Sequence, residues 1–307
     1  MTARKTAKTP LRLRSGEPLA KGIRRIARAQ VDAACRELQK AEGPREAIHQ
    51  ARTALKKLRA LLQLVAEEFN PASLQREKHA FRDAARLLAP IRDADVQIQT
   101  LRALIETAGL DPEKFARLRG ELEADLARLA SRAGTPKSRA RHILSLARGR
   151  IARWPLKDLE WENLRREIRR AYREGRKALR VYQREPDSEA FHAWRKRVKK
   201  LWYHLRITRS FLPEAVHEWI ARLGEIGEIA GNAQDLAVLR GWLAARVEEP
   251  QSARLLAEID ARLPELQRAA TALGVSFYAE KPREFEDRLR SCGKSGRGAR
   301  ERGKGTV

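Results

Sequence analysis

The chain has 307 residues, is 42% hydrophobic and 6% aromatic, and carries a formal net charge of +25. Ala, Leu, Arg, Lys and Glu dominate, and alternating runs of β-branched residues are absent, which excludes a sheet protein and favours an all-α fold. Most of the excess charge lies between residues 19 and 280. A folded body this basic repels itself, so we expect a polyanionic partner.

The first half divides into helices at its proline and Asx signals. Asn70, Asp111 and Thr135 each precede a proline and are predicted N-caps. Apolar residues recur every three or four positions between these signals. The spacing predicts helices at 19–41, 45–69, 71–108 (bent near Pro90), 112–133 and 137–153.

The second half is predicted to follow the same plan. We expect its helix around 213–247 to be broken near Gly231. No stretch approaches the ~20 apolar residues of a membrane helix, so we expect a soluble cytoplasmic protein with no membrane partner. The predicted helices are 159–184, 188–211, 213–247, 251–273 and a short one at 283–291.

Two similar stretches indicate an internal duplication. "IHQARTALKKLRALLQL" spans 48–64 and "FHAWRKRVKKLWYHLRI" spans 191–207. Each is preceded by an arginine-rich helix and followed by an acid at a matching offset, Asp95 in "RDADV" and Asp235 in "NAQDLAVL". Three features in one order predict two four-helix bundles related by a pseudo-twofold axis. We therefore divide the chain into a disordered basic arm (1–18), a first repeat (19–153), a second repeat (154–280) and a basic, mostly disordered tail (281–307).

Both stretches place their cations on one side of a helix. At 100° per residue the cations that follow each histidine fall in a stripe about 80° wide and about 15 Å long. Like charges at this spacing destabilise a helix by about 0.2–0.5 kcal/mol per pair, so the stripe indicates a counter-anion with several successive charges. The alternative is a solvated face. The two stripes, called ladders below, are His49, Arg52, Lys56 and Arg59, and His192, Arg195, Lys199 and Arg206.

The ladder histidines and the nearby acids each allow more than one interpretation. His49 and His192 could be core histidines, metal ligands or anion contacts; we favour anion contacts, because only cations lie at helical spacing from them. Asp93, Asp95 and Asp235 could orient the basic groups through charge-assisted hydrogen bonds, or form simple interhelical salt bridges. Both interpretations stay open.

The two histidine stretches, with "RDADV" and "NAQDLAVL", resemble the CHAD domain family, the conserved histidine α-helical domain. The resemblance runs from about Leu19 to Gly274. It implies two helical bundles around a basic cavity or pore, binding of inorganic polyphosphate, and association with polyphosphate granules. The implied polyphosphate-binding residues are His49, Arg52, Lys56, Lys57, Arg59, His192, Arg195, Lys196, Lys199, Lys200, Arg24, Arg28, Arg169 and Arg173, with Asp95, Asp235 and Arg92 as orienting residues.

Two departures from the family pattern matter. Many members carry an N-terminal CYTH domain with a metal-binding ExExK strand; here "ELEAD" (121–125) is the nearest string, and it falls in a predicted helix. The second repeat has Asn232 where the first has Arg92, so the two halves of the cavity are expected to contribute unequally.

The composition and charge allow three functions to be compared. Binding of inorganic polyphosphate suits dense Lys and Arg without stacking platforms. Binding of nucleic acid suits the charge but lacks a helix-turn-helix, zinc-finger or aromatic platform, although the basic tails could bind nucleic acid weakly. An enzyme acting on phosphate chains lacks a Walker loop, an acidic metal cluster or an activated nucleophile. We expect a polyphosphate-binding protein that is not an enzyme and uses no metal or cofactor, with nucleic-acid binding as the alternative.

Overall fold

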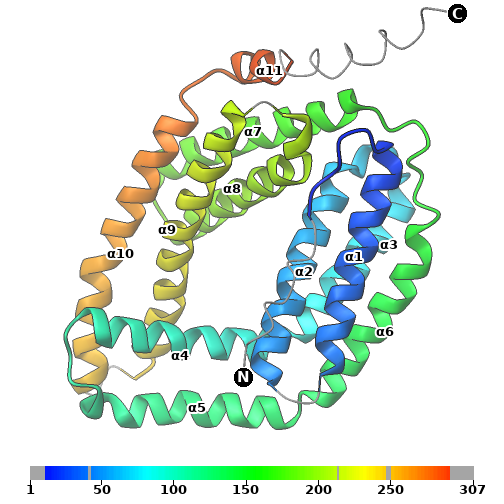
Figure 1. Ribbon diagram of the computed structural model, residues 1–307. Coiled ribbons are helices and arrows are strands. Elements are labelled where there is room, and N and C mark those ends of the chain that lie inside the picture. The colour runs from blue at the N-terminus through cyan, green and yellow to red at the C-terminus, as the bar shows by residue number, and fades with distance from the viewer. Residues whose placement is uncertain (1–10, 41–42, 213, 247–249, 291–307) are drawn as a thin grey trace, which may run out of the picture.

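The computed structural model describes residues 11–40, 43–212, 214–246 and 250–290, and these residues form helices without any strand, as predicted. The first group of helices packs together on one side of the molecule (Figure 1). It consists of α1 (Leu19–Gln39), α2 (Pro44–Leu64), α3 (Pro71–Leu87) and α6 (Gly134–Ile151).

A second group repeats part of this arrangement. α7 (Trp161–Arg184) packs on α8 (Ser188–Thr208) as α1 packs on α2, and α8 in turn packs on α9 (Ala215–Ala244). α10 (Pro250–Phe277) lies along α9, and α11 (Pro282–Arg290) lies against α7. The repeated helix pair is consistent with the predicted duplication, which stays a prediction.

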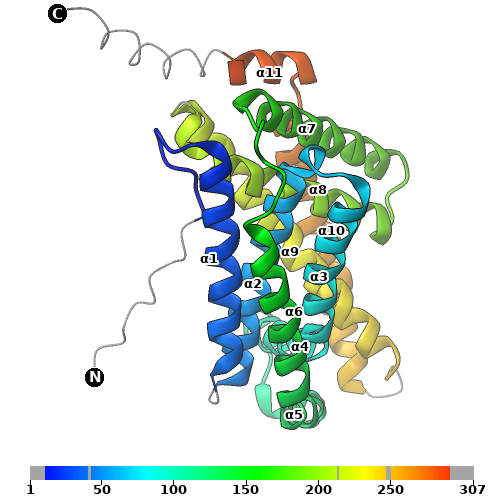
Figure 2. The ribbon, with the colours of Figure 1, turned by 90° about the vertical axis from the view of Figure 1, so that its right-hand side faces the viewer.

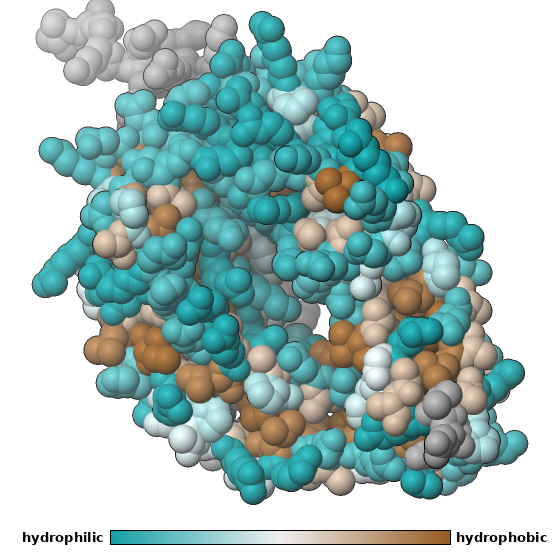
Figure 3. Space-filling model, turned by 180° about the vertical axis from the view of Figure 1, so that it is seen from behind, coloured by the Kyte–Doolittle hydropathy of each residue, from teal (hydrophilic) through white to brown (hydrophobic). Residues whose placement is uncertain are grey.

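Two helices connect the groups. α4 (Ala89–Thr107) and α5 (Ala116–Ser131) run side by side from the first group toward the foot of α9 and α10 (Figure 1). Short 3₁₀ turns lie at 66–68, 112–115 and 209–211. Because α4 contacts α9 and α2 contacts α8, these four helices surround the middle of the molecule. Figure 3 shows this middle hollowed on the face opposite to that of Figure 1, with hydrophilic side chains along much of the rim.

Several helix signals act as predicted. The side chain of Asn70 accepts from the backbone N–H of Ser73 at 2.9 Å, and that of Asp111 accepts from Glu113 at 3.1 Å. The predicted bend near Pro90 is a full break, with Leu88 between α3 and α4. Thr135 is not an N-cap, because α6 already begins at Gly134.

The predicted break near Gly231 was wrong. α9 is continuous from Ala215 to Ala244, because Gly231 and the glycines before it keep helical geometry and serve packing instead. The predicted arm also begins to pack earlier than expected: Leu13 is buried and its N–H donates to the carbonyl of Ile207 at 2.9 Å. Residues 1–10 and 291–307 of the predicted arm and tail lie outside the described residues.

The core of the first group is mainly aliphatic, and that of the second group is richer in aromatic residues. Ile23, Ile26, Leu58 and similar residues fill the first group. In the second, Tyr172 stacks on Phe285 with ring centroids 4.0 Å apart, which holds α11 against α7. No helix among the described residues is both long enough and apolar enough to cross a lipid bilayer.

Candidate anion-binding site

The two ladders converge in the middle of the molecule. Solvent reaches the Lys56 side chain on α2, yet the surrounding helices enclose it. Desolvation, and after it the positive charges of Arg52, Arg195, Arg92 and Lys199, lower the pKa of its ammonium to about 8. Two of these four cations belong to α8. Cations from both repeats therefore share one space, which we call the groove.

Arg52 and Arg195 occupy equivalent positions in the two ladders. Arg52 donates to the carbonyl of Ala85 at 3.0 Å and lies 3.5 Å from an oxygen of Asp93. Arg195 lies beside Asp235, whose charge favours the guanidinium. The Nε atoms of both arginines are buried without a hydrogen-bond partner. Burial lowers the pKa of both groups, so each repeat presents a partly desolvated guanidinium to the groove.

Glycines on α9 make room for the second ladder. A Cβ added at Gly227 would lie 2.8 Å from Nζ of Lys199, and one at Gly231 would lie 3.6 Å from Nη2 of Arg195. These glycines are spaced by four residues and so face α8 together. In the string "GEIGEIAG" at 224–231 the glycines recur at helical spacing, which indicates a close helix contact; the sequence analysis predicted a helix break there instead.

The ladder histidines begin each row and are half-buried. Burial lowers the pKa of both imidazoles; Arg92 lowers that of His49 as well. Nδ1 of His192 lies 2.6 Å from Oε1 of Gln234 on α9, an interaction that acts against the effect of burial. Both histidines therefore favour the neutral form until another negative charge arrives.

The acids hold cations in position. Asp95 is buried and accepts from Arg92 at 2.5 Å and from Gln99 at 3.0 Å. The charge of Arg92 in turn lowers the pKa of Lys56 and that of Asp235, an acid of the groove. Burial raises the pKa of Asp235, while nearby cations led by Arg195 lower it. Among the described residues, no three His, Cys, Asp or Glu side chains are grouped to hold a metal ion.

Other predicted residues occupy different surroundings. Lys200 on the far side of α8 pairs with Glu167 at 2.9 Å and Glu174 at 3.2 Å, both on α7. Arg59, the last residue of the first ladder, is exposed, and so is Lys196 beside the second ladder. Their charges lower the pKa of Arg52 and of His192, respectively. Lys57 follows Lys56 on α2 and is half-buried.

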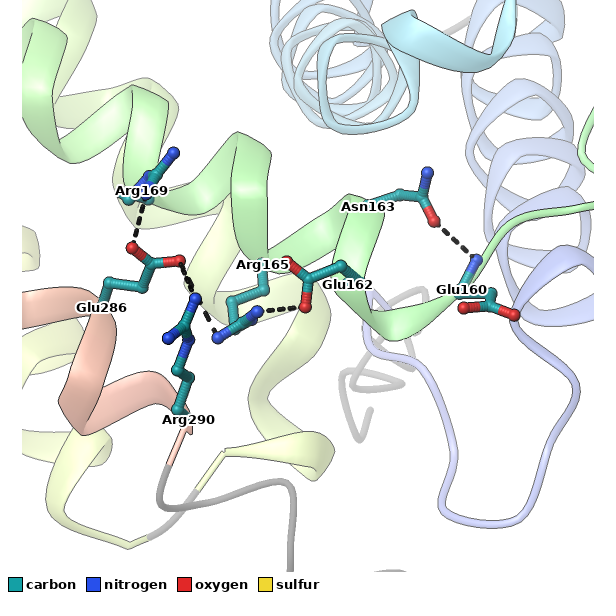
Figure 4. A network of polar contacts seen from close by, with 7 residues as sticks. All are labelled: Glu160, Glu162, Asn163, Arg165, Arg169, Glu286 and Arg290. Carbon is teal, nitrogen blue, oxygen red and sulfur yellow. Dashed lines mark hydrogen bonds and ion pairs between the residues drawn. The ribbon is translucent and has the colours of Figure 1, made fainter. Parts of the chain in front are cut away.

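The four arginines on α1 and α7 do not join the ladders. Arg24 donates to the carbonyl of Trp154 at 2.7 Å, and Arg28 is exposed. Arg169 donates to Glu286 of α11 at 2.5 Å (Figure 4). Arg173 is exposed on α7. These positions face other neighbours because α1 and α7 pack behind α2 and α8.

A cavity extends from the groove between α4, α9 and α10. Its volume is about 410 Å³. Arg92 and Asp235 line it at the groove, and Arg262 of α10 lines it farther out, held by the hydroxyl of Thr107 at 2.6 Å. Sequence reasoning missed Arg262, because α10 has no counterpart to the ladder pattern.

Fold and site together define an all-helical domain in which four helices, two from each half of the chain, enclose a cationic groove. The chain belongs to the CHAD domain family, whose family model matches residues 25–244. It is similar to the crystal structure of the CHAD domain from the plant Ricinus communis, with a TM-score of 0.68 and 18% identity. That similarity covers 90% of this chain and 99% of the plant chain and shows the fold. No curated protein matches the sequence.

Proposed function

We propose that the groove binds inorganic polyphosphate in the cytoplasm, at polyphosphate granules, and leaves the polymer chemically unchanged. The observation that carries the proposal is the convergence of Lys56, Arg52, Arg195 and Lys199 from two repeats into one enclosed space. Charges this close repel each other, and an anion that enters between them relieves the repulsion. Resemblance to a polyphosphate-binding family points the same way.

The ladders favour a polymer of phosphates over nucleic acid. Trp202 lies on α8 close to Lys199 and Arg206, and its indole N–H donates to the carbonyl of Ile220 at 3.0 Å. Its ring already faces Arg206, with the guanidinium carbon 4.3 Å from the centroid. Trp194 is fully buried. Neither ring is presented to a nucleobase, whereas inorganic polyphosphate needs no stacking surface.

The same geometry supports binding without catalysis. Asp95 holds Arg92, Asp93 lies beside Arg52, and Asp235 lies beside Arg195. A carboxylate engaged in this way orients a cation and is a poor general base. Incubation with polyphosphate and Mg²⁺ should release no phosphate; release by the purified chain would contradict this part of the proposal.

Binding of labelled short-chain polyphosphate, with and without duplex DNA, tests the function. Polyphosphate should bind in preference to DNA at equal phosphate concentration, and its affinity should fall steeply with salt. The variant R52Q/K56Q/R195Q should lose affinity by more than a hundredfold while keeping its helical content. The matched control R132Q/R139Q/R141Q removes three exposed arginines outside the groove. Displacement by DNA phosphate for phosphate, or equal loss in the control, would overturn the proposal.

A further inference from the structure

A third row of cations runs along the outer side of α7. At 100° per residue its members fall within about 60° of each other and cover about 27 Å of helix. The buried side of α7, which includes Ile168, Gly175 and Leu179, lies opposite. All members of the row, called the outer stripe below, are exposed: Arg166, Arg173, Lys177, Arg180 and Arg184.

Within the span of the outer stripe, from residue 166 to 184, Glu167 and Glu174 point to another side of α7, and Glu162 lies one turn before Arg166 on the stripe side. Glu162 pairs with Arg165, Glu167 pairs with Lys200 at 2.9 Å, and Glu174 pairs with Lys200 at 3.2 Å and with Arg197 of α8 at 2.8 Å. No ion pair within the described part of the chain involves the outer stripe. From Arg166 to Arg184 the outer stripe therefore contains cations and no acid.

Some exposed cations elsewhere have an acidic partner. Arg240 pairs with Asp260 at 2.6 Å, and Arg148 pairs with Asp32 at 2.5 Å. An acid-free row on one helix costs helix stability, about 0.2–0.5 kcal/mol for each like-charge pair at i, i+3 or i+4. A bound polyanion converts that repulsion into attraction.

The outer stripe cannot belong to the groove. α7 packs mainly on α8, and the Lys200 side of α8 faces α7 while its ladder faces α2 and α9. α7 runs along the upper edge of the molecule in both ribbon views (Figures 1 and 2). The stripe and the groove are therefore separated by a helix layer of about 8–10 Å.

We propose that the outer stripe binds a second segment of polyphosphate, so that one molecule cross-links two stretches of the polymer. The inference rests on the proposed function of the groove. A row about 27 Å long without a pocket fits an extended chain of charges and not a single ion. The rings of Tyr172 and Tyr182 on α7 are buried, so the stripe offers no surface on which bases could stack.

Light scattering of the full chain mixed with long-chain polyphosphate tests the inference. The wild type should form large particles through cross-linking. The stripe variant R173Q/K177Q/R180Q should reduce the scattering at least fivefold, while its affinity for short-chain polyphosphate in the groove stays within twofold of the wild type. The slope of log affinity for long chains against log salt should fall by about 2. The control R132Q/R139Q/R141Q removes the same charge from residues that share no helix face, and should scatter like the wild type.

Each outcome is decisive. Undiminished scattering by the stripe variant, or an equal loss in the control, would overturn the second site and leave the groove unaffected. Stripe-dependent binding of duplex DNA that is tighter than that of polyphosphate would show that the occupant is wrong. A wild type that fails to bind even short-chain polyphosphate would instead overturn the proposed function of the groove.

Discussion

At the scale of single residues, the two ladder histidines are poised to take up protons with the ligand. Burial holds the pKa of His49 and His192 below the ordinary 6.5 in the free protein. A phosphate oxyanion nearby favours the imidazolium and should raise both values. Binding then takes up protons, so affinity should increase as the pH falls from neutral through the pKa of the complex.

Histidine titration followed by NMR checks this expectation. Both ladder imidazoles should titrate below 6.5 in the free protein and above it with short-chain polyphosphate bound. His204 is fully buried, with its pKa lowered to about 3, and serves as the internal reference that should not move. Unchanged titration of both ladder histidines would remove them from the site.

Lys56 should strengthen the binding of polyphosphate but lower the stability of the free protein. Its folded pKa of about 8 lies below the model-peptide value of 10.5, so the cost of its charge is full below pH 8 and vanishes as the pH rises past 10.5. At pH 7, K56M should raise the free energy of unfolding by about 1 kcal/mol, less than the pKa shift alone implies, because solvent screens the ammonium. Polyphosphate affinity should fall about tenfold. Chemical denaturation and calorimetry measure the two effects, and a variant that is both less stable and unchanged in affinity would contradict the assignment.

At the scale of elements, the glycines of α9 leave space for the cationic side chains of α8. A Cβ at Gly227 would force the end of the flexible Lys199 side chain to move, with little strain on the helix itself. Gly241 lies on the same helix, exposed and with no atom within 4 Å of its added Cβ. The two glycines thus separate helix propensity from the packing of the ladder.

Alanine substitution at the two positions should give opposite results for binding. G241A should raise stability by up to about 1 kcal/mol through helix propensity and leave affinity unchanged. G227A should weaken polyphosphate binding several-fold, because Lys199 is displaced. Equal affinities for the two variants, measured by calorimetry, would show that the packing of Lys199 against Gly227 has no role in binding.

The same element shows what the sequence could and could not predict. The helices and both ladders followed from periodicity, since His49, Arg52 and Lys56 repeat at helical spacing. The packing role of Gly227 and Gly231 could not be predicted, because a glycine within a helical pattern indicates a helix break unless the side chain that packs against it is known. Lys200 and Arg169 were assigned to the site by resemblance alone; only packing shows that Glu167 and Glu286 hold them elsewhere.

At the scale of the whole molecule, contacts between the halves, one of them buried, keep the groove assembled. Nε2 of His204 on α8 donates to the carbonyl of Ala60 on α2 at 3.1 Å, and Arg170 of α7 pairs with Glu67. His204 lies on the opposite side of α8 from Arg195 by helical spacing. It therefore ties the helices that carry the two ladders without taking part in the groove.

Acid should loosen this tie. The pKa of His204 is about 3 in the fold against 6.5 in the unfolded chain, so its contribution to stability is complete above pH 6.5 and is lost as the pH falls toward 3. The loss for this group approaches 1.4 kcal/mol per pH unit in that window. H204Q should be less stable than the wild type at pH 7, with a difference that shrinks below pH 6. Urea unfolding at several pH values measures this difference in stability. A difference that does not change with pH would contradict a buried, neutral imidazole.

The central claim is that cations of both repeats form one site. Calorimetry of short-chain polyphosphate with the wild type, R52Q, R195Q and the double variant tests it most directly, at a salt concentration that suppresses exposed contacts. The account predicts one chain per protein, a loss of about tenfold to a hundredfold in each single variant, and losses that are not additive in the double variant. Two independent sites, each abolished by one substitution while the other keeps its affinity, would contradict it.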